Sequence, residues 1–181
     1  MTRYVALLRG INLGGRRLKM DELRAAFAAL GFANAQTLLA SGNVIFTSDL
    51  DDQTQLKQKI ESGLEAEFGF PVPTLLRTQA QIEALLAADP ASNIAPDKDT
   101  KLHVSFLAAP LPTSLKLPHI SADPDFEVHK IDELHLFDLV RLGPSTGSVD
   151  LMDWLAKHFG AGATTRTWNT VLKLQAKLAT V

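Results

Sequence analysis

The order of the predicted secondary-structure elements in residues 3–77 constrains the fold more than any other feature of this sequence. Residues 3–8 form a short apolar run that ends at a glycine, which is typical of a buried central strand. The elements that follow are a helix at 20–30, a hairpin at 36–47, a helix from Asp51 or Asp52 to Phe68, and a strand at 72–77. The order strand, helix, strand, strand, helix, strand predicts a ferredoxin-like βαββαβ plait.

The second half of the chain shows a similar but less complete order of elements. We expect a strand at 101–108, and then a short helix or turn near 113–116 in the proline-rich stretch 110–124. A hairpin of 126–130 and 133–140 follows, and Ser148 caps a helix at about 149–159. A short strand at 163–166 and a last helix at about 168–178 complete this half. The fold class is therefore α/β (α+β), with two ferredoxin-like βαββαβ-type plait halves and a C-terminal helix.

A polar, proline-containing stretch separates these halves. Residues 1–88 form the N-terminal half, which a third helix after Thr78 completes, and residues 101–181 form the C-terminal half. Residues 89–100 contain Pro90 and Pro96 and are expected to be the linker.

Composition excludes several classes of site and of protein. The chain contains no cysteine, which rules out disulfides and thiolate chemistry and fits a reducing cytosol. No apolar run approaches the roughly 18 residues that a membrane span needs. The net charge of −2 argues against a general affinity for nucleic acid, although basic residues gather in residues 1–24. We expect a soluble cytoplasmic protein.

A glycine-rich loop with three nearby arginines follows the first strand. Its spacing is neither G-x-G-x-x-G nor a P-loop. In a plait the end of the first strand, the turn at 41–43 and the loop at 68–71 lie at one end of the sheet. Backbone N–H groups and arginines in such a place suit an anion. The expected ligand-binding residues are Arg9, Asn12, Ser41 and Asn43, with Gly10, Gly14, Gly15 and Gly42 shaping the backbone and Arg16 and Arg17 steering the ligand. The alternative is that these residues only shape turns.

A second polar cluster occupies residues 164–170, at the start of the last helix. Thr167 is a natural N-cap, with Asn169 as an alternative. Because helix N-termini attract anions, Arg166 and Asn169 are expected to complete the site. The alternative is that the threonines only cap the helix and Trp168 only packs.

The remaining polar residues do not identify a reaction. The five histidines lack metal-ligand spacing and are predicted to occupy strand or helix surfaces: His103, His119, His129, His135 and His158. The sequence contains no recognisable nucleophile with its base and no recognisable coupled acid–base pair. We therefore predict no metal and no cofactor, and we leave open whether the chain is an enzyme.

Several stretches resemble one bacterial family. They are residues 4–15, 20–24, 30–32, 41–46, 101–107 and 164–174, and together they are similar to the proteins grouped as domain of unknown function 1697. The resemblance implies an α/β fold of two plait-like halves and no established activity. The family commonly has Asn where this chain has Thr167, which preserves a helix cap but removes an amide from any shared site.

These observations favour a protein that binds a small phosphorylated ligand or nucleotide after its first strand. One alternative is a nucleic-acid-binding module that uses the sheet and the basic loop. The other is an interaction or structural protein without a ligand.

Overall fold

The structure is a computed structural model, which describes residues 1–11, 18–32, 34–94, 98–122, 125–141 and 147–180. These residues form a mixed α+β fold with two antiparallel sheets and five α-helices. They divide into two compact units, which we call unit 1 (residues 1–82 and 174–181) and unit 2 (residues 83–173). The predicted domain boundaries at 88 and 101 concern which parts of the chain fold on their own, and they stay a prediction.

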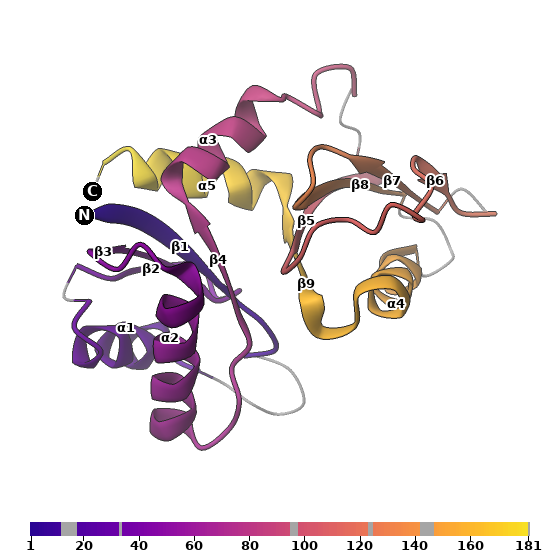
Figure 1. Cartoon of the computed structure of the whole chain (residues 1–181). Helices are drawn as coiled ribbons and strands as arrows, with labels where there is room; N and C mark the ends of the chain where they lie inside the picture. Colours follow the sequence, from indigo (N-terminus) through magenta and orange to yellow (C-terminus); the bar gives the residue numbers. More distant parts are fainter. Residues whose placement is uncertain (12–17, 33, 95–97, 123–124, 142–146, 181) are drawn as a thin grey trace. The chain divides into compact units, whose positions relative to one another are not determined.

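Unit 1 is built on a four-stranded sheet (Figure 1). Its elements are β1 (Thr2–Leu8), α1 (Met20–Ala29), β2 (Gln36–Leu38), β3 (Asn43–Ser48), α2 (Gln53–Phe68) and β4 (Thr74–Thr78). The strand order is β2-β3-β1-β4, and all neighbours are antiparallel. The expected six-element order is therefore present. Pro73 precedes β4, which is an edge strand, where proline costs no ladder hydrogen bond.

The ends of α2 show why the sequence specifies this helix. The Asp52 carboxylate accepts hydrogen bonds from the backbone N–H groups of Thr54 and Gln55 at 2.8 and 3.2 Å. Gly69 ends the helix in the left-handed conformation, at φ 75°. Both features satisfy backbone groups that a helix leaves unpaired at its ends.

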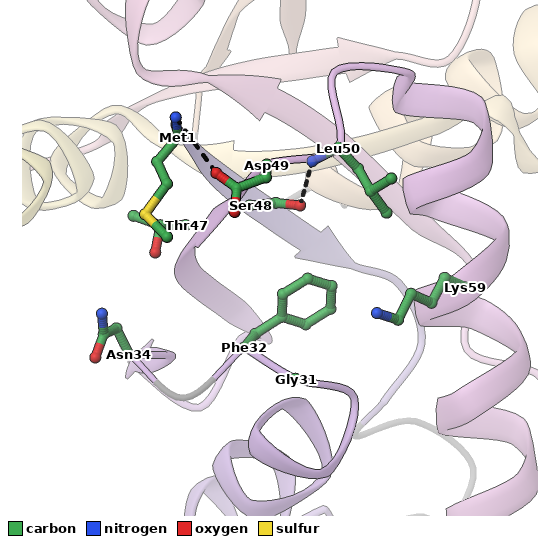
Figure 2. Close-up of a pocket in the computed structure, with 9 residues that line it drawn as sticks. All are labelled: Met1, Gly31, Phe32, Asn34, Thr47, Ser48, Asp49, Leu50 and Lys59. Carbon is green, nitrogen blue, oxygen red and sulfur yellow. Dashed lines mark hydrogen bonds and ion pairs between the residues drawn. The ribbon is translucent and has the colours of Figure 1, made fainter.

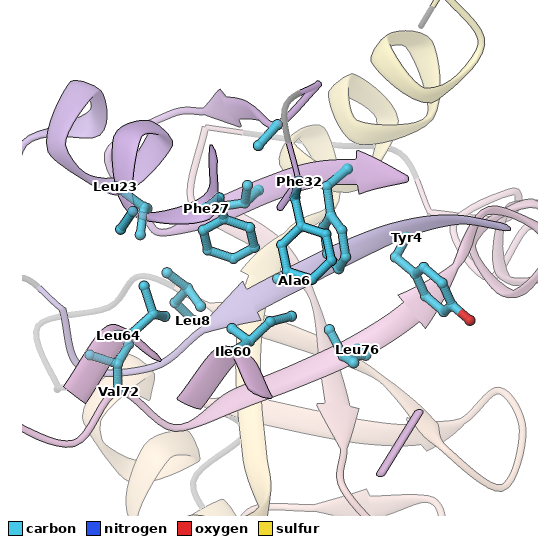
Figure 3. Close-up of a cluster of buried hydrophobic side chains, with 14 of the residues drawn as sticks. Tyr4, Ala6, Leu8, Leu23, Phe27, Phe32, Ile60, Leu64, Val72 and Leu76 are labelled. Carbon is cyan, nitrogen blue, oxygen red and sulfur yellow. The ribbon is translucent and has the colours of Figure 1, made fainter. Parts of the chain in front are cut away.

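Helices α1 and α2 cover one face of the sheet, and the core of unit 1 lies between them and the strands (Figure 3). Alternation along β1 points Tyr4, Ala6 and Leu8 into this core. The Phe46 ring of β3 packs against Tyr4 and Phe32, with centroid distances of 5.7 and 4.7 Å. The core is continuous and apolar.

The chain passes from one unit to the other within two of its helices. α3 (Gln79–Ala87) follows β4 directly, and α5 (Trp168–Leu178) ends in unit 1. Thr78 caps α3 as expected, because its Oγ1 accepts from the N–H of Gln81 at 3.2 Å. The Arg3 guanidinium donates to the carbonyl of Leu178, which joins the first strand to the last helix within unit 1.

Unit 2 contains the second sheet. Its elements are β5 (Thr100–Leu107), β6 (His119–Ile120), β7 (Phe126–Lys130), β8 (His135–Arg141), α4 (Gly147–Phe159), the 3-10 helix η1 (Gly160–Gly162) and β9 (Ala163–Thr167). The order β6-β7-β8-β5-β9 is antiparallel throughout. The four strands β7-β8-β5-β9 follow the same order as β2-β3-β1-β4 of unit 1, with β6 added at the edge.

Two expectations for this half need correction, and one choice between alternatives is decided. Of the short helix or turn expected near 113–116, the turn is present, and it is closed by the Leu115 N–H, which donates to the Pro112 carbonyl at 3.0 Å. The proline-rich sequence favours a turn, because proline removes helix hydrogen bonds. Helix α4 begins at Gly147, so Ser148 lies inside it. His135 is buried, because its Nδ1 lies 2.7 Å from the Asp132 carboxylate and its ring packs on Phe106.

Candidate functional site

Three loops of unit 1 meet at the end of β1. The Leu8 N–H donates to the Gly42 carbonyl at 2.8 Å, and the Arg9 N–H donates to the Pro73 carbonyl at 2.9 Å. The first bond joins β1 to the β2–β3 turn, and the second joins it to the loop between α2 and β4. The meeting of these loops, which the element order predicted, is present, and it places Arg9 and Gly10 beside both.

The β2–β3 turn is held together by its own polar side chain. Asn43 is fully buried, and its Nδ2 donates to the Leu38 carbonyl at 2.8 Å and to the Ser41 hydroxyl at 2.9 Å. Gly42 has φ 73°, and an added Cβ would lie 2.7 Å from Ile11 Cδ1. Asn43 and Gly42 thus shape this turn and let it approach β1 closely. A ligand contact by Ser41 or Asn43 stays a prediction.

Arg9 and Gly10 start the glycine-rich loop. The Arg9 side chain is half-buried, and Gly10 has φ 70°, a conformation that favours glycine. Asn12, Gly14, Gly15, Arg16 and Arg17 lie outside the described residues. The described part of the site is therefore a charged, half-buried arginine at a junction of three loops.

The second predicted cluster belongs to unit 2. Arg166 is buried, and its Nη1 donates to the Thr164 hydroxyl at 2.9 Å and to the Thr165 carbonyl at 2.8 Å. Burial lowers the pKa of Arg166 to about 10. Asn169 is exposed, and Thr167 caps α5 by accepting from the Thr170 N–H at 3.3 Å. A contribution of Arg166 and Asn169 to a shared site stays a prediction.

Unit 1 also contains a hollow of about 390 Å³ beside the start of β1 and the end of β3, which sequence reasoning missed. Figure 2 shows Phe32 and Lys59 facing one another in it, with the Lys59 Nζ 5.0 Å from the ring centroid. Asp49 adds a carboxylate, which pairs with the amino group of Met1 at 3.5 Å. The lining residues are Met1, Gly31, Phe32, Asn34, Thr47, Ser48, Asp49, Leu50 and Lys59. They come from distant segments, so no local motif signals this hollow.

Sequence reasoning also missed a buried carboxyl in unit 2. Asp138 is fully buried in β8, where its Oδ2 accepts a hydrogen bond from the Ser105 hydroxyl. The available signal was a single carboxylate inside the apolar strand 135–140. Burial of such a group is costly, so its position calls for a physical explanation.

The described residues hold no group of three or more His, Cys, Asp or Glu that could bind a metal ion. Nor does any helix in the described ranges combine the length and the hydrophobicity that a membrane crossing requires.

Two antiparallel sheets with the same core strand order, covered by helices, define an α+β protein with a loop junction at the end of its first strand. The chain belongs to the family described as protein of unknown function DUF1697, which matches residues 1–136. Among solved structures it is similar to the conserved bacterial protein SP0830 from Streptococcus pneumoniae, with 26% identity, a TM-score of 0.73 and coverage of 99% of both chains. No curated protein matches.

Proposed function

We propose that the chain binds a small anionic ligand, such as a nucleotide or a phosphorylated metabolite, at the junction of loops that follows β1. The observation that carries this proposal is the pair of backbone bonds from Leu8 to Gly42 and from Arg9 to Pro73. They hold the start of a basic, glycine-rich loop against two other loops. An arginine at such a junction supplies charge and a planar pair of donors for phosphate oxygens.

We infer that each half of the chain is a ferredoxin-like plait, because the strand orders β4-β1-β3-β2 and β9-β5-β8-β7 follow one antiparallel pattern. The absence of cysteine supports a cytoplasmic location.

The test is thermal unfolding with inorganic phosphate, ATP and a sugar phosphate as probes. A ligand that binds only the folded state raises the melting temperature. We expect at least one probe to do so, and Arg9→Gln to abolish the effect. Arg24→Gln is the matched control, because Arg24 is exposed on α1, where it pairs with Asp21 at 2.7 Å.

Two outcomes would contradict the proposal. One is that none of the three probes stabilises the protein, and the other is that stabilisation is the same in Arg9→Gln. Binding of single-stranded RNA that weakens steeply with salt would instead support the nucleic-acid alternative.

A further inference from the structure

The face of the unit 2 sheet that α4 covers contains an unusual polar row. In an antiparallel sheet, directly opposed residues point to the same face. Asp138 of β8 lies opposite His103 of β5, and His103 lies opposite Thr167 of β9. Leu136 and Val140, which flank Asp138 on this face, pack in one cluster with Leu151 and Leu155 of α4. Asp138, at one end of the row, therefore lies on the part of the sheet that α4 covers.

The polar atoms at the centre of this row are incompletely satisfied. Ser105 donates to Asp138 Oδ2, but Asp138 Oδ1 and the buried Nδ1 of His103 have no hydrogen-bond partner in the part of the chain that the structure describes. An ionised carboxylate in this position would be an uncompensated buried charge, which is far more costly than a neutral acid.

A chain of hydroxyl groups links the buried carboxyl to less buried residues. The Ser105 Oγ lies 2.8 Å from Thr165 Oγ1, and Thr165 is half-buried. Next along β9 on this face, Thr167 is exposed. The hydrogen-bonded hydroxyl groups therefore run from the buried carboxyl to a half-buried residue on the edge strand β9.

We propose that Asp138 and His103 form a proton-responsive pair in unit 2, which is most stable when both groups are neutral and which loosens the packing of α4 when Asp138 ionises. Burial raises the pKa of Asp138 to about 7, against which the Ser105 hydrogen bond acts only in part. Burial, and then the charge of Lys101, lower the pKa of His103. The pair is independent of the ligand site proposed in unit 1.

The other titratable groups on this face are exposed, except His119 of β6, which lies opposite Val128, is half-buried and stacks on Trp154 of α4 with a centroid distance of 5.0 Å. His119 is unchanged in both variants that test the proposal. Lys101 of β5 and Lys130 of β7 share the face but are exposed. The titratable residues of α4 are also exposed: Asp150, Asp153, Lys157 and His158.

The two groups change the stability of unit 2 with pH in opposite directions. Asp138 binds its proton more tightly in the folded state, so its contribution is lost as pH rises from the unfolded value toward 7. His103 binds its proton less tightly in the folded state, so its contribution is lost as pH falls below its usual value of 6.5. In a variant that lacks one of the two groups, the stability of unit 2 should therefore follow the pH dependence of the group that remains.

The experiment is amide hydrogen exchange of α4, corrected for intrinsic rates, between pH 5 and pH 7 in His103→Gln and Asp138→Asn. In His103→Gln we expect protection of α4 to fall by tenfold or more with rising pH, since each pKa unit of differential binding is about tenfold. In Asp138→Asn we expect it to rise by up to about tenfold. Helix α2 of unit 1 is the internal reference and should follow neither trend.

Parallel trends in the two variants, or α4 protection that changes no more than that of α2, would overturn the proposal. If one variant does not fold, the other variant still tests the proposal, because the protection of α4 is expected to change with pH in a stated direction in each variant. Binding of phosphate by unit 1 has no bearing on either result.

Discussion

The central strands β1 and β5 hold the same place in their sheets, yet they present different side chains to the helices that cover them. β1 directs Tyr4, Ala6 and Leu8 into an apolar core beneath two helices. β5 directs His103 and Ser105 toward the face that α4 covers. The same strand order thus supports a core that depends on packing alone in unit 1 and one that contains ionisable groups in unit 2.

The missing helix explains part of this difference. Between β1 and β2 the chain forms α1, whereas between β5 and β7 the described residues form a turn and β6. A face with one helix has less apolar surface to cover it, so polar residues such as His103 and Thr165 can remain partly accessible. The comparison predicts that, between pH 5 and pH 7, stability changes little in unit 1 and changes with pH in unit 2.

The largest expected effect is in the apolar core of unit 1. Phe46→Ala should reduce the free energy of unfolding by about 3–5 kcal/mol, because it leaves a cavity among the rings of Tyr4, Phe27 and Phe32. Urea denaturation at pH 6 and pH 8 measures it, and the loss should be equal at both. Met152→Ala on the exposed side of α4 is the control and should stay within about 0.5 kcal/mol.

Ser105→Ala should have the next largest effect, in unit 2. It removes the hydrogen bond to a buried carboxyl, which costs about 1–3 kcal/mol. Since that bond lowers the pKa of Asp138, its loss should move the pKa further above its usual value. A carboxyl titration by NMR follows this shift. A downward shift would show that Ser105 does not stabilise the ionised form.

The two turn glycines at the end of β1 should differ from each other. Gly42→Ala should cost about 1–3 kcal/mol, since it combines a positive φ with a contact of 2.7 Å to Ile11. Gly10→Ala should cost about 1 kcal/mol from the positive φ alone, because nothing lies within 4 Å of its added Cβ. Denaturation of both variants measures the difference. Equal costs would mean that the turn can move away from Ile11.

The smallest effect should come from the cap of α2. Asp52→Ala should reduce the free energy of unfolding by less than the substitutions above, because it frees the N–H groups of Gln55 and Thr54 at an exposed helix end. Hydrogen bonds from these groups lower the pKa of Asp52, so the contribution should be lost as pH falls through the lowered pKa. Asp52→Asn, which also caps helices, is the matched control and should retain most of the stability.

Local sequence signals predicted unit 1 well. Asp51 or Asp52 and Gly69 marked the two ends of α2, and the short apolar run 3–8 before a glycine identified β1. The element order alone brought Arg9 and Gly42 to the same end of the sheet, because strand direction follows from connectivity.

Features that depend on distant residues could not be predicted in the same way. Whether His103 lies on a surface or under a helix depends on register across β5 and β8, and on which face α4 covers. His135 became buried through its bond to Asp132 and its contact with Phe106, which the spacing of histidines does not reveal. The hollow beside Lys59 arises only when separate segments meet.

The most direct test of the contrast between β1 and β5 is a titration of the Asp138 side-chain carboxyl in the wild-type protein by carbon-13 NMR. The burial of this group between Leu136 and Val140, with a serine as its hydrogen-bond donor, predicts protonation at a pH near 7. His103 observed in the same sample should titrate below 6.5. An Asp138 carboxyl that titrates near pH 4 would contradict the account, because it would mean that the sheet of unit 2 accommodates the charge.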